Sequence, residues 1–159
     1  MAFKNVYKGK RVLVTGHTGF KGSWLCLWLK ELGAEVYGIA LEPKTKNDNF
    51  VVSGLEKKIS HHICDIRNLK KLTQVFQDIQ PQIVFHLAAQ ALVKNSFDDP
   101  VDTFATNLMG TVHVLEAIRQ TPGVEAAVMI TSDKCYKNVE WEIIIYPCWI
   151  PGRECLPTG

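Results

Sequence analysis

The chain has 159 residues, of which 47% are hydrophobic and 21% are charged, and its formal net charge is +2 at pH 7. This length suits one domain with a hydrophobic core of its own, and the composition excludes a disordered chain. The small, evenly spread positive charge (pI near 8.3) argues against a surface that binds nucleic acid or a membrane.

Strands and helices are predicted to alternate along the chain. Residues 11–15 are rich in branched apolar side chains and end at a glycine, as in a buried strand. Residues 19–32 carry apolar side chains at helical spacing and are followed by Gly33, a typical helix stop. The same criteria predict further strands at 35–41, 58–64, 83–87 and 126–131, further helices at 68–79 and 100–120, and a loop at 43–55.

This alternation predicts an α/β fold with a parallel sheet covered by helices on both faces. We expect a Rossmann-like doubly wound sheet with the strand order 3-2-1-4-5, truncated after about five strands because the pattern fails after about Glu140. Asp99 and Pro100 suit the N-cap and the first position of the long helix. A ligand crevice is expected at the carboxyl ends of the strands.

The cysteines and the N-terminus bear on the cellular compartment. None of the five cysteines has C-x-x-C spacing, and Cys26 and Cys64 lie in apolar patterns where a cysteine is usually a small buried hydrophobe. We expect neither disulfides nor a metal site. The polar, basic residues 1–10 do not resemble a signal peptide, and no apolar run is long enough to span a bilayer, so a cytoplasmic protein is expected.

A glycine-rich turn joins the first strand to the first helix. Gly16, Gly19 and Gly22 have the spacing that permits a tight turn and the close approach of a pyrophosphate, and Phe20 lies among them. The helix N-terminus adds free N–H groups and a positive dipole end. Because the glycines lie in the required strand–turn–helix context, the turn is predicted to bind a dinucleotide. Lys21 suits either a phosphate contact or a solvated surface.

The G-x-x-G-x-x-G spacing resembles the extended short-chain dehydrogenases/reductases. Residues 15–25 are similar to the CDP-glucose 4,6-dehydratase subfamily in particular. This resemblance covers roughly residues 8–141. It implies a lyase of nucleotide-sugar metabolism that uses NAD on a nucleotide-sugar substrate such as CDP-glucose, supplies deoxysugars for surface polysaccharide, and forms homodimers or larger assemblies when intact.

Acidic residues after the second and third strands are candidates for the adenosine half of the cofactor. A carboxylate at the position of Glu42 usually holds the ribose hydroxyls, although Glu42 also suits an exposed loop. The turn has no arginine for a 2′-phosphate, which favours NAD over NADP. Asp65 and Ile66 follow the third strand, and in the resembling family this aspartate contacts the adenine edge. A helix N-cap is the alternative for Asp65.

Further candidates lie on the fourth strand and the long helix. His86, at the end of an apolar strand, is more often a hydrogen-bonded core residue than a catalyst. The small residues Ala88 and Ala89 let the backbone pass close to the cofactor, and Gln90 is similar to a family residue near the nicotinamide. An asparagine such as Asn107 helps to order a water near the active site in the superfamily, and a polar surface residue is the alternative.

Three residues after the fifth strand carry the implied dehydration chemistry. The resemblance implies that Ser132 hydrogen-bonds the 4-hydroxyl of the substrate and that Asp133 is the general acid for the departing 6-hydroxyl. It further implies that Lys134 assists removal of the C5 proton or stabilises the enolate.

The central base of the family, a tyrosine followed four residues later by a lysine, is absent. Tyr136 is followed at that distance by Glu140 and Tyr146 by Ile150, and no lysine follows Lys137. Residues 142–159 are also unlike the family, so we expect an incomplete NAD-binding domain at 1–141 and an atypical tail. A reading-frame change or a premature stop is our hypothesis for this tail, and sequencing of the encoding DNA tests it.

Three readings of function follow. The first is a sugar-nucleotide 4,6-dehydratase of the CDP-glucose type, of which this chain is a truncated and inactive form. The second is a fragment that binds NAD without turnover. The third is a sugar-nucleotide epimerase or reductase of the same fold, against which Asp133 argues because an epimerase needs no acid for the loss of water.

Overall fold

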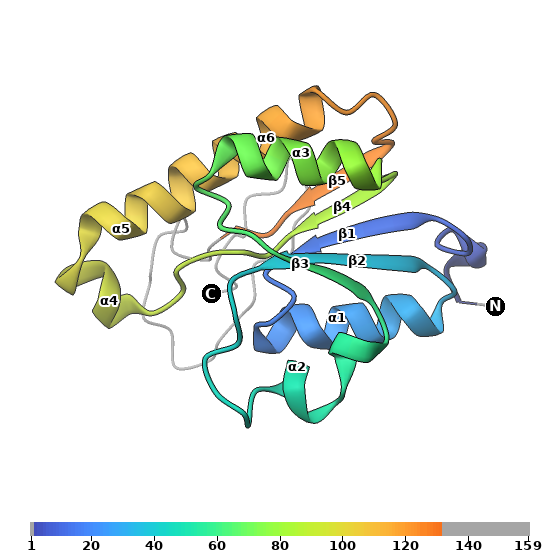
Figure 1. Cartoon of the computed structure of the whole chain (residues 1–159), viewed down its shortest axis with the longest axis horizontal. Coiled ribbons are helices and arrows are strands. Elements are labelled where there is room, and N and C mark those ends of the chain that lie inside the picture. Colours follow the sequence, from blue (N-terminus) through green and yellow to red (C-terminus); the bar gives the residue numbers. More distant parts are fainter. Residues whose placement is uncertain (1, 132–159) are drawn as a thin grey trace, which may run out of the picture.

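The computed structural model describes residues 2–131, which form a five-stranded sheet with every neighbouring pair of strands parallel. The strand order is β3-β2-β1-β4-β5 (Figure 1), which confirms the predicted Rossmann-like topology. The strands are β1 Arg11–Thr15, β2 Glu35–Ala40, β3 Ser60–Ile63, β4 Ile83–His86 and β5 Ala126–Met129. The predicted domain boundary at 141/142 lies outside the described residues.

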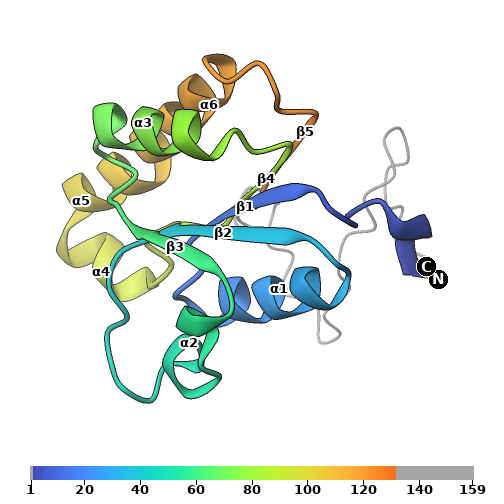
Figure 2. The same cartoon turned by 45° about the vertical axis from the view of Figure 1, so that its right-hand side comes forward.

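Helices cover both faces of this sheet (Figures 1 and 2). Helices α1 and α2 lie on one face and α3 and α6 on the other, while α4 and α5 lie beyond the carboxyl ends of the strands. The α-helices are α1 Phe20–Glu31, α2 Asn49–Val52, α3 Leu69–Ile79, α4 Val93–Asp98, α5 Pro100–Phe104 and α6 Gly110–Arg119. Short 3₁₀ turns span Ala2–Asn5 and Leu55–Lys57, and a π-helix spans Ala105–Met109.

The loop predicted at 43–55 is the main correction to the expected elements. It contains the one-turn helix α2, which forms because Phe50 is buried against the sheet. Helix α4 was not expected either, and the single helix predicted at 100–120 contains the π-turn between α5 and α6. The predicted cap of this helix is confirmed, since the Asp99 carboxylate accepts the backbone N–H of Asp102 at 2.9 Å.

Two hydrophobic clusters hold the helices on the sheet. On β1, Val12 and Val14 face the α1 side while Leu13 faces α3 and α6, as the alternation of a strand requires. All three side chains are fully buried. Burying a side chain of this size stabilises the fold by about 1.5–3 kcal/mol. The burial of these three side chains therefore holds β1 firmly at the centre of the sheet.

Cys26 and Cys64 are buried free thiols, as their apolar surroundings predict. Burial raises the pKa of Cys26 to about 12. No helix among residues 2–131 is both long enough and apolar enough to cross a membrane.

Candidate functional site

The predicted site residues meet where the parallel strands end. Thr15, the last residue of β1, pairs in register with Ile39 of β2 and His86 of β4. The turns that leave these strands therefore start at one edge of the sheet. Gly16, Glu42 and Gln90 lie in those turns, and Asp65 follows β3, which is parallel to β2. The turns that carry these predicted cofactor residues therefore lie at a common edge of the sheet (Figure 1).

The turn between β1 and α1 requires its glycines. Gly16 has φ +76°, and a Cβ on it would lie 2.8 Å from the backbone nitrogen of Ala88. A Cβ on Gly22 would lie 2.2 Å from the carbonyl oxygen of Gly16. No side chain could replace either hydrogen without displacing backbone. The contact is with the backbone of Leu87 and Ala88, so it places the turn after β4 directly against Gly16.

The N-terminus of α1 is built to receive an anion. Its N-cap is Gly19, which makes no side-chain capping bond, and both Gly19 and Phe20 are exposed. The first-turn N–H groups and the positive end of the dipole thus face the edge of the sheet. Thr18 fixes the turn to the end of β2 by donating a hydrogen bond to the carbonyl of Leu41 at 3.1 Å. These features fit the pyrophosphate of a dinucleotide.

His17 lies underneath this turn and is fully buried. Its ring fits against Gly38, on which a Cβ would lie 2.4 Å from the ring, and it contacts Phe50 edge-on with centroids 5.1 Å apart. Within residues 2–131, neither ring nitrogen has a hydrogen-bond partner. Burial lowers the pKa of His17 to about 4, and the backbone carbonyl of Ile39 offsets only part of this effect.

His86 is a buried, hydrogen-bonded core residue, as expected for a histidine at the end of an apolar strand. Its Nδ1 lies 2.7 Å from the hydroxyl of Thr15, and its Nε2 lies 3.1 Å from the hydroxyl of Thr111 on α6. Burial lowers the pKa of His86, so the ring is neutral at pH 7. The hydroxyl of Thr111 in turn donates to the carbonyl of Asn107 at 2.7 Å.

Asn107 lies in the π-helix, and its side chain holds the turn after β4. Its Oδ1 accepts the backbone N–H of Gln90 at 2.7 Å, and its Nδ2 donates to the carbonyl of Gln90 at 2.9 Å. The Gln90 side chain donates to Thr103 and to the carbonyl of Leu92. Asn107 therefore fixes the backbone at the predicted nicotinamide side, and its role in ordering a water stays a prediction.

Asp65 is held by Arg67 in the turn after β3. Its carboxylate accepts the backbone N–H of Arg67 at 2.9 Å and guanidinium N–H groups at 2.6 and 2.9 Å. The guanidinium also pairs with Asp102 of α5. The hydrogen bonds from Arg67 hold the pKa of Asp65 below its ordinary value. The N-cap of α3 is Asn68, whose side chain accepts the N–H of Lys71, so the alternative that Asp65 caps this helix is wrong.

The remaining predicted residues are placed less completely. Glu42 is exposed in the loop after β2, at the expected edge. The three residues with predicted catalytic roles, Ser132, Asp133 and Lys134, lie outside the described residues. Thr131, the last one described, follows β5 at the carboxyl edge. Nowhere in residues 2–131 do three potential ligands gather to hold a metal ion.

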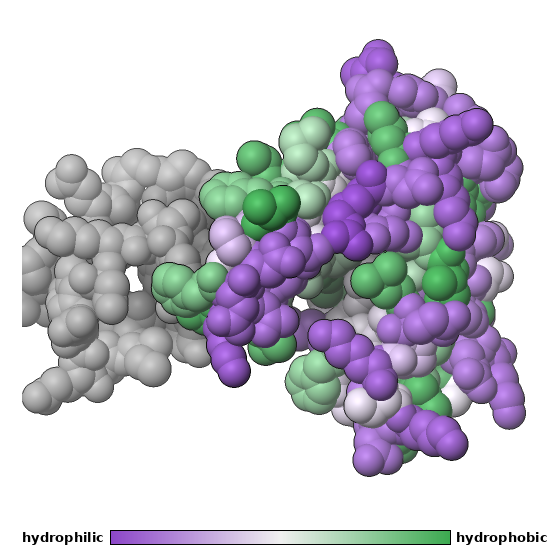
Figure 3. Space-filling model, turned by 60° about the vertical axis from the view of Figure 1, so that its left-hand side comes forward, coloured by the Kyte–Doolittle hydropathy of each residue, from purple (hydrophilic) through white to green (hydrophobic). Residues whose placement is uncertain are grey.

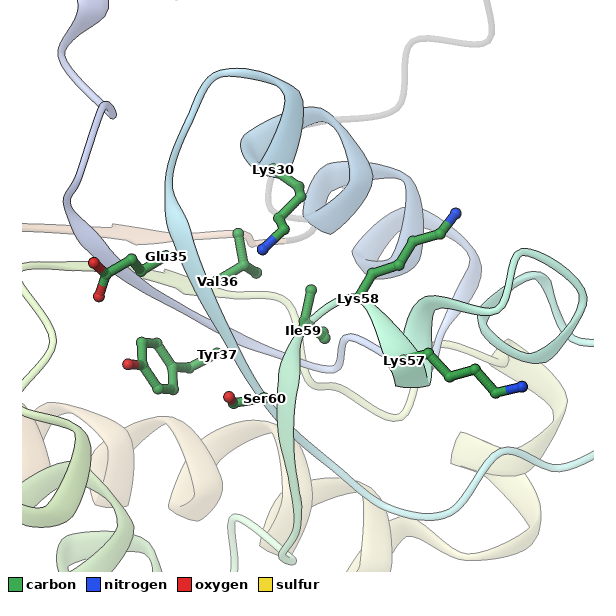
Figure 4. A pocket seen from close by; sticks show the side chains of 8 residues that line it. All are labelled: Lys30, Glu35, Val36, Tyr37, Lys57, Lys58, Ile59 and Ser60. Carbon is green, nitrogen blue, oxygen red and sulfur yellow. The ribbon is translucent and has the colours of Figure 1, made fainter.

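A cavity of about 400 Å³ lies elsewhere, beside the first residues of β2 (Figure 4). It is lined by Lys30, Glu35, Val36, Tyr37, Lys57, Lys58, Ile59 and Ser60. Figure 4 shows Lys57 and Lys58 extending away from Lys30 and Glu35, so their ammonium groups do not converge on one point. Because ligands of open α/β sheets bind at the carboxyl ends of the strands, the glycine turn is the better candidate site.

Sequence reasoning missed several residues that shape the site. Thr15 binds His86 and accepts the N–H groups of Leu87 and Ala88, each at 3.2 Å. A polar residue at the end of an otherwise apolar strand was the signal for this role. Arg67 gave a weaker signal, namely a charged residue two positions after a predicted adenine contact.

Comparisons with known proteins agree with this geometry. Residues 13–142 match the sequence model of a family described as GDP-mannose 4,6 dehydratase. A CDP-glucose 4,6-dehydratase of Salmonella typhimurium is 52% identical over 141 residues, which cover 89% of this chain and 39% of that protein. A GDP-mannose 4,6-dehydratase of Vibrio cholerae is 33% identical, over 69% of this chain and 31% of that protein. The chain thus spans less than half the length of these curated relatives.

Solved structures show the same fold. An epimerase from Methanothermobacter thermautotrophicus superposes with a TM-score of 0.75 at 32% identity, over 89% of this chain and 41% of that chain. A UDP-glucose 4-epimerase of Thermus thermophilus, solved in complex with NAD, superposes with a TM-score of 0.63 at 37% identity, over 70% of this chain and 34% of that chain. Both likenesses confirm the predicted fold class.

Proposed function

Because this chain belongs to the GDP-mannose 4,6 dehydratase family, we propose that it forms the dinucleotide-binding part of an NAD-dependent sugar-nucleotide 4,6-dehydratase that acts on CDP-glucose. The observation that carries this proposal is the phosphate turn, in which Gly16 and Gly22 leave no room for a Cβ and the N-terminus of α1 is uncapped by any side chain. The similarity to the Salmonella CDP-glucose enzyme supports the substrate.

In this proposal, each turn at the carboxyl edge binds a different part of the cofactor. The N–H groups at the start of α1 hold the pyrophosphate, Glu42 accepts from the ribose hydroxyls, and Asp65 with Ile66 meets the adenine. Gln90, fixed by Asn107, lies toward the nicotinamide. NAD bound there would supply the hydride acceptor for oxidation at C4 and the hydride for reduction at C6.

The residues after β5 carry the dehydration in this proposal. Ser132 hydrogen-bonds the 4-hydroxyl, and Lys134 assists the loss of the C5 proton once C4 is a ketone. Asp133 donates a proton to the 6-hydroxyl, which leaves as water. Hydride addition at C6 and uptake of a proton at C5 would then give a CDP-4-keto-6-deoxyglucose. A general acid at Asp133 favours a dehydratase over an epimerase, because epimerisation releases no water.

Turnover also needs a base that takes the proton of the 4-hydroxyl. The family uses a tyrosine with a lysine four residues later, and that pair is absent from these 159 residues. A polypeptide of this sequence alone therefore binds NAD and does not turn over CDP-glucose.

We also propose that the intact protein forms a homodimer through the surface of α4, α5 and the π-helix. This surface exposes large apolar side chains, namely Val93, Phe97, Val101, Phe104 and Leu108. Figure 3 shows apolar side chains, in green, between polar ones on the side of the molecule that carries these helices. Sedimentation of the intact protein at increasing concentration tests the proposal, and a monomer at every concentration contradicts it.

Calorimetric titration tests the proposed function. We expect binding of NAD, weaker binding of NADP, and no 4-keto product when the chain is incubated with NAD and CDP-glucose. The Gly22→Ala variant is the matched control, because its Cβ fills the turn without changing the charge. Failure of the wild-type chain to bind either dinucleotide would refute the proposal, and formation of product would refute the inactivity of this polypeptide.

A further inference from the structure

The carboxylate of Asp65 is almost fully occupied by one neighbour. Arg67 gives it three N–H donors: its backbone N–H to Oδ1 at 2.9 Å, Nε–H shared between both oxygens at 3.1 and 2.9 Å, and an Nη2 hydrogen to Oδ2 at 2.6 Å. An ionised carboxylate offers about four acceptor positions. Arg67 therefore leaves about one, with its direction set by the rigid fork of the guanidinium.

The turn that contains this pair is also fixed to the helix across from it. The guanidinium of Arg67 pairs with Asp102 of α5. Ile66 packs so closely on α6 that a Cβ on Gly110 would lie 2.5 Å from its Cδ1. The ring of His113 donates from Nδ1 to the carbonyl of Ile66 at 3.0 Å. The carboxylate thus has a defined position relative to α5 and α6 as well as to the sheet.

We propose that Arg67 is a positioning residue that gives the site its preference for a base with an exocyclic amine, as in adenine, over a base with a carbonyl at that position. The inference rests on the proposed function, because it assumes that a dinucleotide binds at this edge. An amine hydrogen meets the single acceptor position that Arg67 leaves on Asp65. A carbonyl oxygen placed there would face a carboxylate without a hydrogen between them.

The arginine is needed because Asp65 and Arg67 are only partly buried, with side-chain exposures of 30% and 41%. Without the fork, the carboxylate can rotate and pair with water, and its remaining acceptor no longer points in one direction. A lysine at this position keeps the charge but loses the parallel pair of N–H donors. The amine preference therefore depends on the shape of the guanidinium more than on its charge.

The experiment compares the affinities of NAD and nicotinamide hypoxanthine dinucleotide, which carries a carbonyl in place of the amine. Calorimetry is run on the wild-type chain and on the Arg67→Ala, Arg67→Lys, Asp65→Asn and Asp65→Asn/Arg67→Ala variants. Arg119→Ala is the matched control, since this arginine pairs with Glu116 on the exposed side of α6. Circular dichroism checks the fold of each variant.

We expect the wild-type chain and Arg119→Ala to bind NAD more tightly than the hypoxanthine analogue. Both Arg67 variants should bind NAD about two- to fivefold more weakly, as expected for a partly exposed ion pair, and should lose most of the preference. Arg67→Ala should have no further effect in the Asp65→Asn background, a coupling that a general loss of stability would not produce. If Arg67→Ala unfolds, the base preference of Arg67→Lys tests the inference instead.

Two results overturn the inference while leaving the proposed function intact: an unchanged base preference in folded Arg67 variants that still bind NAD, or tighter NAD binding on loss of the arginine, which would make Arg67 a competitor of the base. Failure of the wild-type chain to bind either dinucleotide overturns the proposed function, and this inference with it.

Discussion

Acid should destabilise this fold through His17. Burial among Phe50 and other apolar groups lowers the pKa of its ring from 6.5 to about 4, and the backbone of Ile39 offsets only part of this shift. Above pH 6.5 the ring is neutral in both the folded and the unfolded chain. As the pH falls below 6.5 the unfolded chain takes up the proton first, so stability decreases until about pH 4. Between pH 7 and pH 5 this loss amounts to about 2 kcal/mol.

Urea denaturation at pH 7 and pH 5, followed by circular dichroism, measures this loss. The control is His17→Phe, which keeps an aromatic ring against Phe50 and Gly38 but has no proton to bind. We expect the variant to lose about 2 kcal/mol less than the wild type over this range, because other groups titrate equally in both. The titratable side chains that act on His17 are His61 and His62, both of which lower its pKa. Equal losses in the two proteins would refute a buried, neutral His17.

Three further predictions concern the turn, the helix and a thiol. The Gly22→Ala variant should lose NAD binding in calorimetry, because its Cβ would lie 2.2 Å from the carbonyl oxygen of Gly16, while retained affinity would contradict this geometry. Asn107→Ala should lower the free energy of unfolding by about 0.5–1.5 kcal/mol, because it removes two exposed hydrogen bonds to the Gln90 backbone that water can partly replace, and an unchanged urea midpoint would argue against the pairing. The Cys26 thiol should react with iodoacetamide only after unfolding, as peptide mass spectrometry can show, since it is buried and its pKa is about 12.

The sequence predicts the centre of the sheet well, because β1, β2 and β4 are short, mainly buried apolar runs separated by helical patterns. Strand β3 is partly polar and β5 is mostly exposed, so these two were predicted from the alternation of strands and helices and from right-handed connections. The short helices are a different case. Helix α2 depends on one buried residue, Phe50, and α4 has no buried residue at all, so neither produces a hydrophobic period. The π-helix at Ala105–Met109 is a change in backbone hydrogen bonding, which side-chain periodicity does not report.

The site was predictable where it depends on local order along the chain. Gly16 and Gly22 act through their own turn, so their spacing was sufficient. The burial of His17 was not predictable, because the space for its ring comes from Gly38 on the next strand. The occupation of Asp65 likewise depends on a partner, Arg67, whose conformation is set by a helix distant in sequence.

A series of hydrogen bonds with one defined direction joins the end of β1, before the glycine turn, to Asn107 in the π-helix. The hydroxyl of Thr15 accepts the backbone N–H groups of Leu87 and Ala88, so its own hydrogen is donated to Nδ1 of His86. This places the proton of the neutral ring on Nε2, which donates to the hydroxyl of Thr111, and Thr111 donates to the carbonyl of Asn107.

Each hydrogen bond in this series can run in only one direction. A second proton on His86 would lie on Nδ1 and would face the hydrogen that Thr15 donates. The lowered pKa of the buried His86 agrees with this requirement. Strand β1, which leads into the glycine turn, and Asn107, which fixes Gln90, are therefore held by one neutral histidine between them. These two hydrogen bonds give a structural reason for a histidine at this position, because few other side chains accept at one end and donate at the other across a gap of this length.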